Sequence, residues 1–203
     1  MMSRHEPIPM KRIASPILVV LFLAGCASVK IEPESVRVNG LIRKPSVIYV
    51  SEFSTTEGAW EMPVSAGDLG NMKAQASHDL YNAMLKVLAD IAPTQAAPMP
   101  LPTSGLLVTG QFVHVNPGNR ALRMGFGFGA GATHVETCVL IYDLAQSPSI
   151  PVATFITRGG SGSEPGFVAG GATSAVSGIS GLSADWGRTA KEVRDFLNKR
   201  MVD

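Results

Sequence analysis

The sequence of 203 residues contains little charge and little cysteine. Charged side chains make up 16% of the chain, and 17 basic residues nearly balance 16 acidic residues. This balance gives nucleic acid no electrostatic attraction to the protein, so we predict that nucleic acid is not a partner. Two cysteines, Cys26 and Cys138, exclude a disulfide-rich scaffold. Apolar residues make up 45% of the chain, which is enough for a core and excludes a disordered protein.

The start of the chain lacks an apolar run long enough for a transmembrane helix. Residues 13–25 are uncharged and follow the basic residues Arg4, Lys11 and Arg12. A membrane-spanning helix needs about 20 apolar residues, whereas a basic start and a shorter apolar run are typical of a secretory signal. We therefore predict that residues 1–25 are a signal peptide.

The signal ends in Leu23-Ala24-Gly25-Cys26, which resembles the lipobox of bacterial lipoproteins. The resemblance implies cleavage between Gly25 and Cys26, a diacylglyceryl group on the Cys26 thiol and an acyl chain on its new amine. Several chains anchor a protein durably, because each buried methylene contributes about 0.8 kcal/mol. The alternative is cleavage at an ordinary small-residue site, with Cys26 incidental. The residue after Cys26 is Ala27 and not aspartate. By resemblance to the sorting rules of enterobacterial lipoproteins, this favours the outer membrane, facing the periplasm, over retention at the inner membrane.

The rest of the chain predicts one small domain behind a tether. Residues 26–44 are polar and mixed, which indicates a lipidated N-terminus and tether, and residues 45–203 form the domain. Alternating or continuous apolar runs predict strands, and apolar spacings of three and four predict helices. The predicted strands cover residues 46–53, 105–115, 133–143 and 151–157, and the predicted helices cover 66–91 and 185–201. The order strand-helix-strand-strand-strand-helix predicts an α/β (α+β) fold, a single small sheet of about four strands with two helices on one face.

Proline and glycine mark the connections. Residues 93–104 contain four prolines and are predicted to be a connector. Residues 158–183 are rich in glycine and serine, and a mobile or locally packed segment is expected there. Small residues occur four apart at Gly166, Gly170, Ser174 and Gly178. If this segment were a helix, they would form a ridge that another helix could approach closely.

A second glycine-rich stretch carries a family resemblance. Gly118-Asn119-Arg120 is followed by Arg123 and then by alternating glycines at 125, 127, 129 and 131. With this motif, the region from about residue 45 to 203 resembles the domain-of-unknown-function 4410 family of bacterial lipoproteins. The resemblance implies an envelope lipoprotein and transfers no catalytic residues, because the family has none established.

The same stretch supplies candidate contacts with a ligand or partner. The guanidinium groups of Arg120 and Arg123 suit bidentate binding of a carboxylate or phosphate. Pairing with the chain's own acidic residues, or solvation, is nevertheless expected for two surface arginines, and contact with a ligand or partner is the alternative. Alternation leaves bare backbone at Gly125, Gly127 and Gly129, which indicates a bend or a close backbone approach, with a partner-binding edge as the alternative.

Two histidines lie near the ends of one strand–loop–strand unit. His114 and His134, together with Glu136, would form a metal site if the two strands paired in a suitable register. No spacing motif supports this, so polar side chains on an exposed face are expected. We predict no metal and no cofactor except the diacylglycerol and acyl chain on Cys26.

Catalytic motifs are also scarce, because no serine lies in a Gly-x-Ser-x-Gly sequence. We therefore predict a non-catalytic binding or accessory module. Its partners are the membrane, through the lipid anchor, and another envelope protein. One alternative is an oligomer-forming structural component that associates through its glycine-rich segments. An envelope hydrolase is a second alternative.

Overall fold

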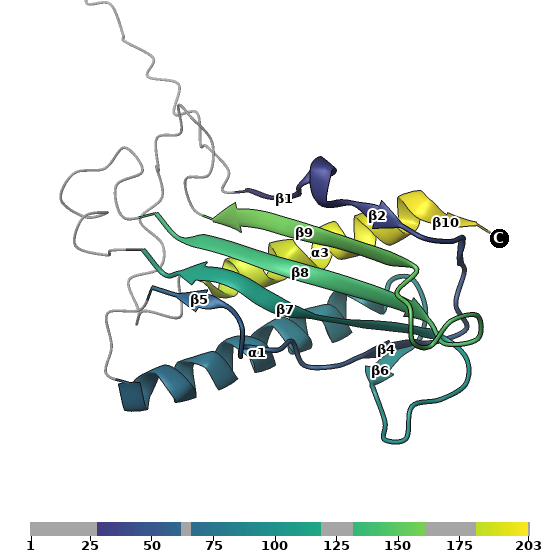
Figure 1. The fold of residues 1–203 in the computed structure, drawn as a ribbon, viewed down its shortest axis with the longest axis horizontal. Coiled ribbons are helices and arrows are strands. Elements are labelled where there is room, and N and C mark those ends of the chain that lie inside the picture. The colour runs from purple at the N-terminus through teal and green to yellow at the C-terminus, as the bar shows by residue number, and fades with distance from the viewer. Residues whose placement is uncertain (1–27, 62–65, 119–131, 161–181, 203) are drawn as a thin grey trace, which may run out of the picture.

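A computed structural model describes residues 28–61, 66–118, 132–160 and 182–202. Figure 1 shows the elements in order. They are β1 (Ser28–Ile31), the 3-10 helix η1 (Pro33–Ser35), β2 (Arg37–Val38), β3 (Ile42–Arg43), β4 (Ile48–Val50), β5 (Ala59–Trp60), α1 (Ala66–Leu88), β6 (Thr94–Ala96), β7 (Leu106–Asn116), β8 (His134–Asp143), β9 (Ala153–Gly160), α3 (Ser183–Arg200) and β10 (Met201–Val202).

Eight strands of the described residues form one mixed sheet, with the path β1-β9-β8-β7-β4-β6. β7, β8 and β9 are antiparallel neighbours, whereas β4 runs parallel to both β7 and β6. β2 also pairs with β9, and β5 also pairs with β7. β3 and β10 form a separate parallel pair, which joins the C-terminal end of the chain to the segment before β4.

The prediction of a single sheet of about four strands is wrong. The four predicted strands are present as β4, β7, β8 and β9, and the two predicted helices as α1 and α3. The sheet is larger because residues 28–38 of the predicted tether supply β1 and β2, residues 59–60 supply β5, and residues 94–96 of the predicted connector supply β6. These strands have two to four residues, too few for alternation to identify them, and they form by pairing with longer strands.

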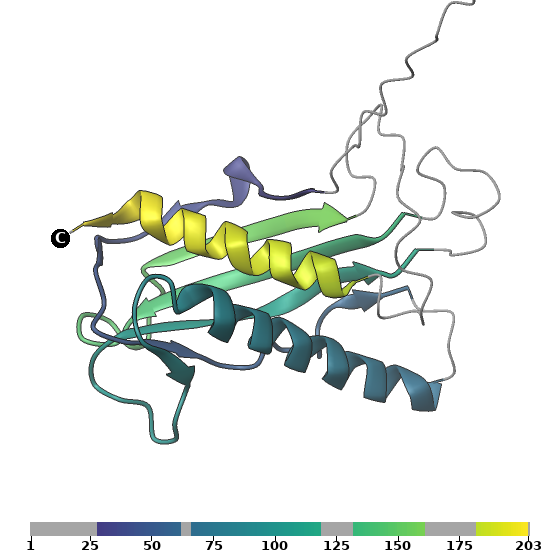
Figure 2. The ribbon, with the colours of Figure 1, turned by 180° about the vertical axis from the view of Figure 1, so that it is seen from behind.

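Both helices cover the same face of the sheet, as seen from behind in Figure 2. Alternate side chains of the strands meet the apolar stripes of the helices there. Phe112 is central to this core, with its ring centroid 5.5 Å from Trp186 and 5.3 Å from Trp60. Each large side chain buried in this way stabilises the fold by about 1.5–3 kcal/mol. No helix of the described ranges has the length and hydropathy needed to cross a bilayer.

The opposite face of the sheet, which we call the open face, carries none of the described helices (Figure 1). Along β8, every second residue from Val135 to Asp143 is buried, and the residues between them are half-buried. This strict alternation places the half-buried set, from His134 to Tyr142, on the open face. β9 continues the pattern with Thr154 and Ile156.

Gly110 in β7 allows a close approach between the core and the neighbouring strand. A Cβ atom at this position would lie 2.1 Å from the carbonyl oxygen of Cys138 and 2.6 Å from Cε1 of Phe53. The carbonyl oxygen belongs to the backbone of β8, so no change of rotamer would relieve the clash. An alanine here would force the two strands apart.

We expect Gly110→Ala to lower the free energy of unfolding by about 2 kcal/mol or more, because overpacking of this kind displaces backbone. The matched control is Gly70→Ala in α1, where nothing lies within 4 Å of the added Cβ. It should raise stability by about 0.5–1 kcal/mol, since glycine weakens a helix. Thermal and denaturant unfolding of the full chain in detergent measure both changes. Equal effects at the two positions would contradict the close approach.

Candidate functional site

A row of polar side chains crosses the open face near the C-terminal end of β7 and the start of β8. Each member contacts the next through a hydrogen bond, an ion pair or a ring contact. We call this set the polar row, and it comprises Asn116, Glu61, His114, His134, Glu136, Arg158 and Glu32. The row draws on the neighbouring strands β7, β8 and β9 and on the residues that follow β5 and β1, so strand pairing assembles it.

A β-bulge in β7 aims two members of the row. Phe112 pairs with Thr137 and His114 pairs with Glu136, so Val113 is an extra residue between them. In a regular strand, His114 would share the buried face of Phe112. The extra residue reverses the alternation, which places His114 on the open face and returns Val115 to the core.

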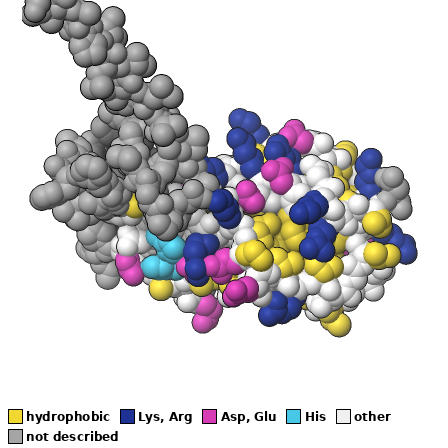
Figure 3. Space-filling model, turned by 90° about the horizontal axis from the view of Figure 1, so that it is seen from above, with side chains coloured by type: hydrophobic (Ala, Val, Ile, Leu, Met, Phe, Trp, Pro, Cys, Tyr) yellow, Lys and Arg dark blue, Asp and Glu magenta, His cyan; other side chains and the backbone are white. Residues whose placement is uncertain are grey.

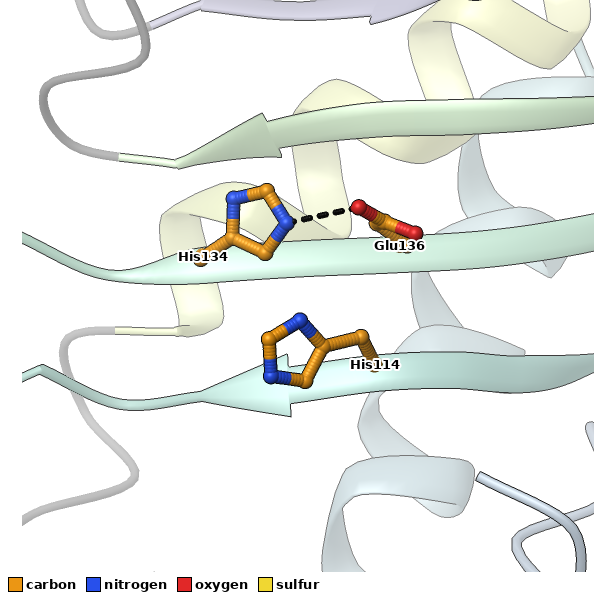
Figure 4. Close-up of side chains that lie close together, drawn as sticks. All are labelled: His114, His134 and Glu136. Carbon is orange, nitrogen blue, oxygen red and sulfur yellow. Dashed lines mark hydrogen bonds and ion pairs between the residues drawn. The ribbon is translucent and has the colours of Figure 1, made fainter. Parts of the chain in front are cut away.

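Glu61 fixes the ring of His114. Nε2 of His114 lies 3.0 Å from Oε1 of Glu61. Nδ2 of Asn116 donates to the other carboxylate oxygen of Glu61, and the backbone N–H of Gly118 donates to Oδ1 of Asn116 at 2.7 Å. Because a carboxylate only accepts hydrogen bonds, Nε2 of a neutral His114 carries the proton, and Nδ1 has the free lone pair. In Figure 4 this second nitrogen is turned towards His134 and Glu136.

Glu136 is the centre of the second group. Its Oε1 lies 2.8 Å from Nε2 of His134 and 2.7 Å from Nε of Arg158, and Arg158 also contacts Glu32. Burial alone would raise the pKa of the Glu136 carboxyl. Hydrogen bonds from His134 and Arg158, and the charges of these groups, outweigh burial and hold this pKa below its ordinary value of 4.5. The carboxylate is therefore ionised at neutral pH.

The two groups meet at three atoms that could act as metal ligands. Ligand atoms of His114, His134 and Glu136 lie within 4.8 Å of one another, and the two imidazole centroids are 5.1 Å apart. Their side chains are 27%, 34% and 15% exposed, so the set is accessible from the open face. Figure 3 shows histidine, acidic and basic side chains gathered beside a hydrophobic patch. Two imidazoles and a carboxylate suit a first-row divalent metal.

The structure brings together some of the candidate site residues named from the sequence, and other candidates lie outside the described residues. The strand register brings His114 to Glu136, although their spacing matches no motif. Glu61, Asn116, Arg158 and Glu32 had no signal in the sequence that marked them as neighbours of these histidines. The predicted lipidation, cleavage and contact residues lie outside the described residues, and these are Gly25, Cys26, Arg120, Arg123, Gly125, Gly127 and Gly129.

The fold and the polar row define an α+β domain with one face covered by helices and one face that presents a polar cluster. The model of the domain of unknown function DUF4410 matches residues 29–178. The chain therefore belongs to this family, which confirms the resemblance drawn from the arginine and glycine motif. No curated protein matches the chain.

Solved structures provide only distant likenesses. A PelC dodecamer from Paraburkholderia phytofirmans is 12% identical with a TM-score of 0.46, and the alignment covers 88% of this chain and 100% of that one. A single-substitution variant of that dodecamer, from the same organism, is 14% identical with a TM-score of 0.41, covering 83% and 96%. An uncharacterised protein is 12% identical with a TM-score of 0.38, covering 79% and 96%. At these values neither activity nor assembly is carried over to this chain.

We expect Glu136→Gln to lower the free energy of unfolding at pH 7 by about 1–3 kcal/mol, because it removes an ionised acceptor of charged hydrogen bonds. The lowered pKa means that ionised Glu136 stabilises the fold above the unfolded-state value near 4.5, and that this contribution is lost as pH falls through the folded-state value. The difference between wild type and variant should therefore shrink in acid.

Unfolding curves between pH 7 and pH 3 measure this change. The matched control is Glu52→Gln, because Glu52 faces His78 at 3.4 Å but its side chain is 59% exposed. Its loss should change stability by about 0–1 kcal/mol. A Glu136→Gln effect that stays constant with pH would contradict the assigned charge.

Proposed function

We propose that the chain is a membrane-anchored envelope lipoprotein that acts as a non-catalytic binding module for another envelope protein. The observation that carries the proposal is the order of signals at the N-terminus: basic residues, a short apolar run and then Leu23-Ala24-Gly25-Cys26. Membership of DUF4410 agrees with this assignment but supplies no activity. The outer membrane, facing the periplasm, is the proposed location.

The short distance between Cys26 and β1 gives the anchor an orienting role. β1 begins at Ser28, and two residues of chain reach at most about 7 Å. Ser28 pairs with Gly160 at the end of β9, and the adjacent Gly159 pairs with Val135 at the start of β8. Acyl chains on Cys26 would thus hold this end of the sheet, with the polar row, beside the bilayer.

The open face supports a role in binding. Cys138 pairs with Ile156 and lies two residues from Leu140 on the same face, and all three are half-buried. An apolar centre beside a charged cluster has the composition of a protein interface. Within the described part of the chain, no helix covers this face (Figure 1).

The state of the one described thiol supports a non-catalytic role. Burial raises the pKa of Cys138, so this thiol is protonated at neutral pH and is a poor nucleophile. The acidic and basic groups of the polar row are engaged with one another. Binding therefore accounts for these features better than nucleophilic catalysis.

Cys26→Ala tests the anchor. Wild-type protein in growing cells should incorporate labelled palmitate and sediment with membranes, and the variant should lose both properties because the acylated thiol is gone. Cys138→Ser is the matched control and should retain both. Incorporation of palmitate by the Cys26→Ala protein would refute lipidation at this site.

Ile156→Lys tests the open face. A charge in the apolar centre should reduce recovery of the partner with the lipidated, full-length protein by about tenfold or more, because lysine would have to be desolvated in the interface. Ile150→Lys is the matched control, since Ile150 is 60% exposed in the β8–β9 connection. Differently tagged copies, cross-linked together, show whether the partner is a second copy. Equal recovery with both lysine variants would contradict binding through this face.

A further inference from the structure

We propose that the polar row binds a first-row divalent metal such as zinc through Nδ1 of His114, Nε2 of His134 and the carboxylate of Glu136. The sequence offered these three residues only on the condition of a suitable strand register, and the pairing of β7 with β8 supplies that register. The inference goes beyond the proposed binding function and does not depend on the lipid anchor. It rests on the donor geometry, on the groups behind the ligands and on the charge of the row.

The donor atoms are close enough to share one ion. Ligand atoms of the three residues lie within 4.8 Å of one another, and zinc bonds of about 2.0–2.2 Å in a tetrahedron separate ligand atoms by about 3.3–3.6 Å. Nε2 of His134 now lies 2.8 Å from Oε1 of Glu136, so a small rotation of partly exposed side chains admits the metal. His134 then carries its proton on Nδ1, and the lone pair of Nε2 faces the ion.

The hydrogen bonds behind His114 are those that a metal ligand needs. Glu61 accepts the Nε2 proton, which selects the tautomer whose Nδ1 lone pair faces the site. Asn116 donates a hydrogen bond to Glu61, and the backbone N–H of Gly118 donates a hydrogen bond to Asn116. A carboxylate behind a histidine in this way orients the ring and raises its basicity as a ligand. On the other side, Arg158 orients Glu136.

The charge of the row favours a divalent cation. Three carboxylates, those of Glu32, Glu61 and Glu136, accompany one guanidinium, that of Arg158, which leaves −2 with neutral histidines. A divalent ion neutralises this excess, whereas an anion such as phosphate would add to it. Half-burial of Glu136 strengthens the attraction, because fewer water molecules screen its charge.

Titration of the full-length protein in detergent with Zn²⁺ alone, followed by calorimetry at neutral pH, tests the site. One equivalent should bind to wild type. His114→Ala and His134→Ala should each weaken that binding about 100-fold or more, and Glu61→Ala should weaken it about 10–100-fold through the orientation of His114. The matched control is His78→Ala on α1, because His78 also faces a glutamate, Glu52, and should leave binding unchanged.

A measurement on wild type avoids dependence on the folding of variants. With ¹⁵N-labelled histidine, Zn²⁺ should shift the ring resonances of His114 and His134 and leave those of His78 in place. Absence of one-equivalent binding, or wild-type affinity in either His114→Ala or His134→Ala, would overturn the site. Cys26→Ala should still bind zinc, so failure of the anchor and failure of the metal site are separate results.

Discussion

The bulge at Val113 determines which side chains of β7 enter the core and which reach the open face. Before the bulge, Phe112 packs against the helices, and after it Val115 does so. Without the extra residue, His114 would point at the aromatic cluster around Phe112, where a polar ring without a partner costs about 1–3 kcal/mol. Val115 would be exposed in its place. One residue therefore completes the apolar layer and places two members of the polar row, His114 and Asn116, on the open face.

The core supports the site mechanically. Asp185 is fully buried near the start of α3, where it accepts a hydrogen bond from Thr133 at 2.8 Å and pairs with Arg188 at 2.6 Å. Thr133 immediately precedes His134, so this contact ties the start of β8 to the helix layer. Leaving the buried Asp185 carboxylate without these partners would destabilise the fold, because a buried charge is poorly solvated. The position of His134 is thus set by buried contacts, while its ring remains partly exposed.

Periodicity predicted the long elements and failed for the short ones and for the site. The apolar stripes of α1 and α3 and the alternation of β8 are long enough to identify from the sequence. β1, β2, β5 and β6 have no such pattern, because their formation depends on the edges they join. The site was missed for a related reason: the contact of His114 with Glu136 requires both the strand register and the bulge, which no local spacing reports. The sequence identified His114, His134 and Glu136 as candidate ligands but did not show that they lie together.

The proposed anchor, metal and interface would influence one another, because β1, the polar row and the apolar centre around Ile156 are connected through the pairing of β1, β9 and β8. Acyl chains on Cys26 would confine β1, and through β9 the start of β8, to the membrane surface. Zinc would change the charge of the polar row from −2 to zero beside the apolar centre around Ile156. A partner that covers this face would contact a neutral polar row when zinc is bound and an acidic polar row when zinc is absent. Affinity for the partner and affinity for zinc would then be linked, each changing the other by the same factor.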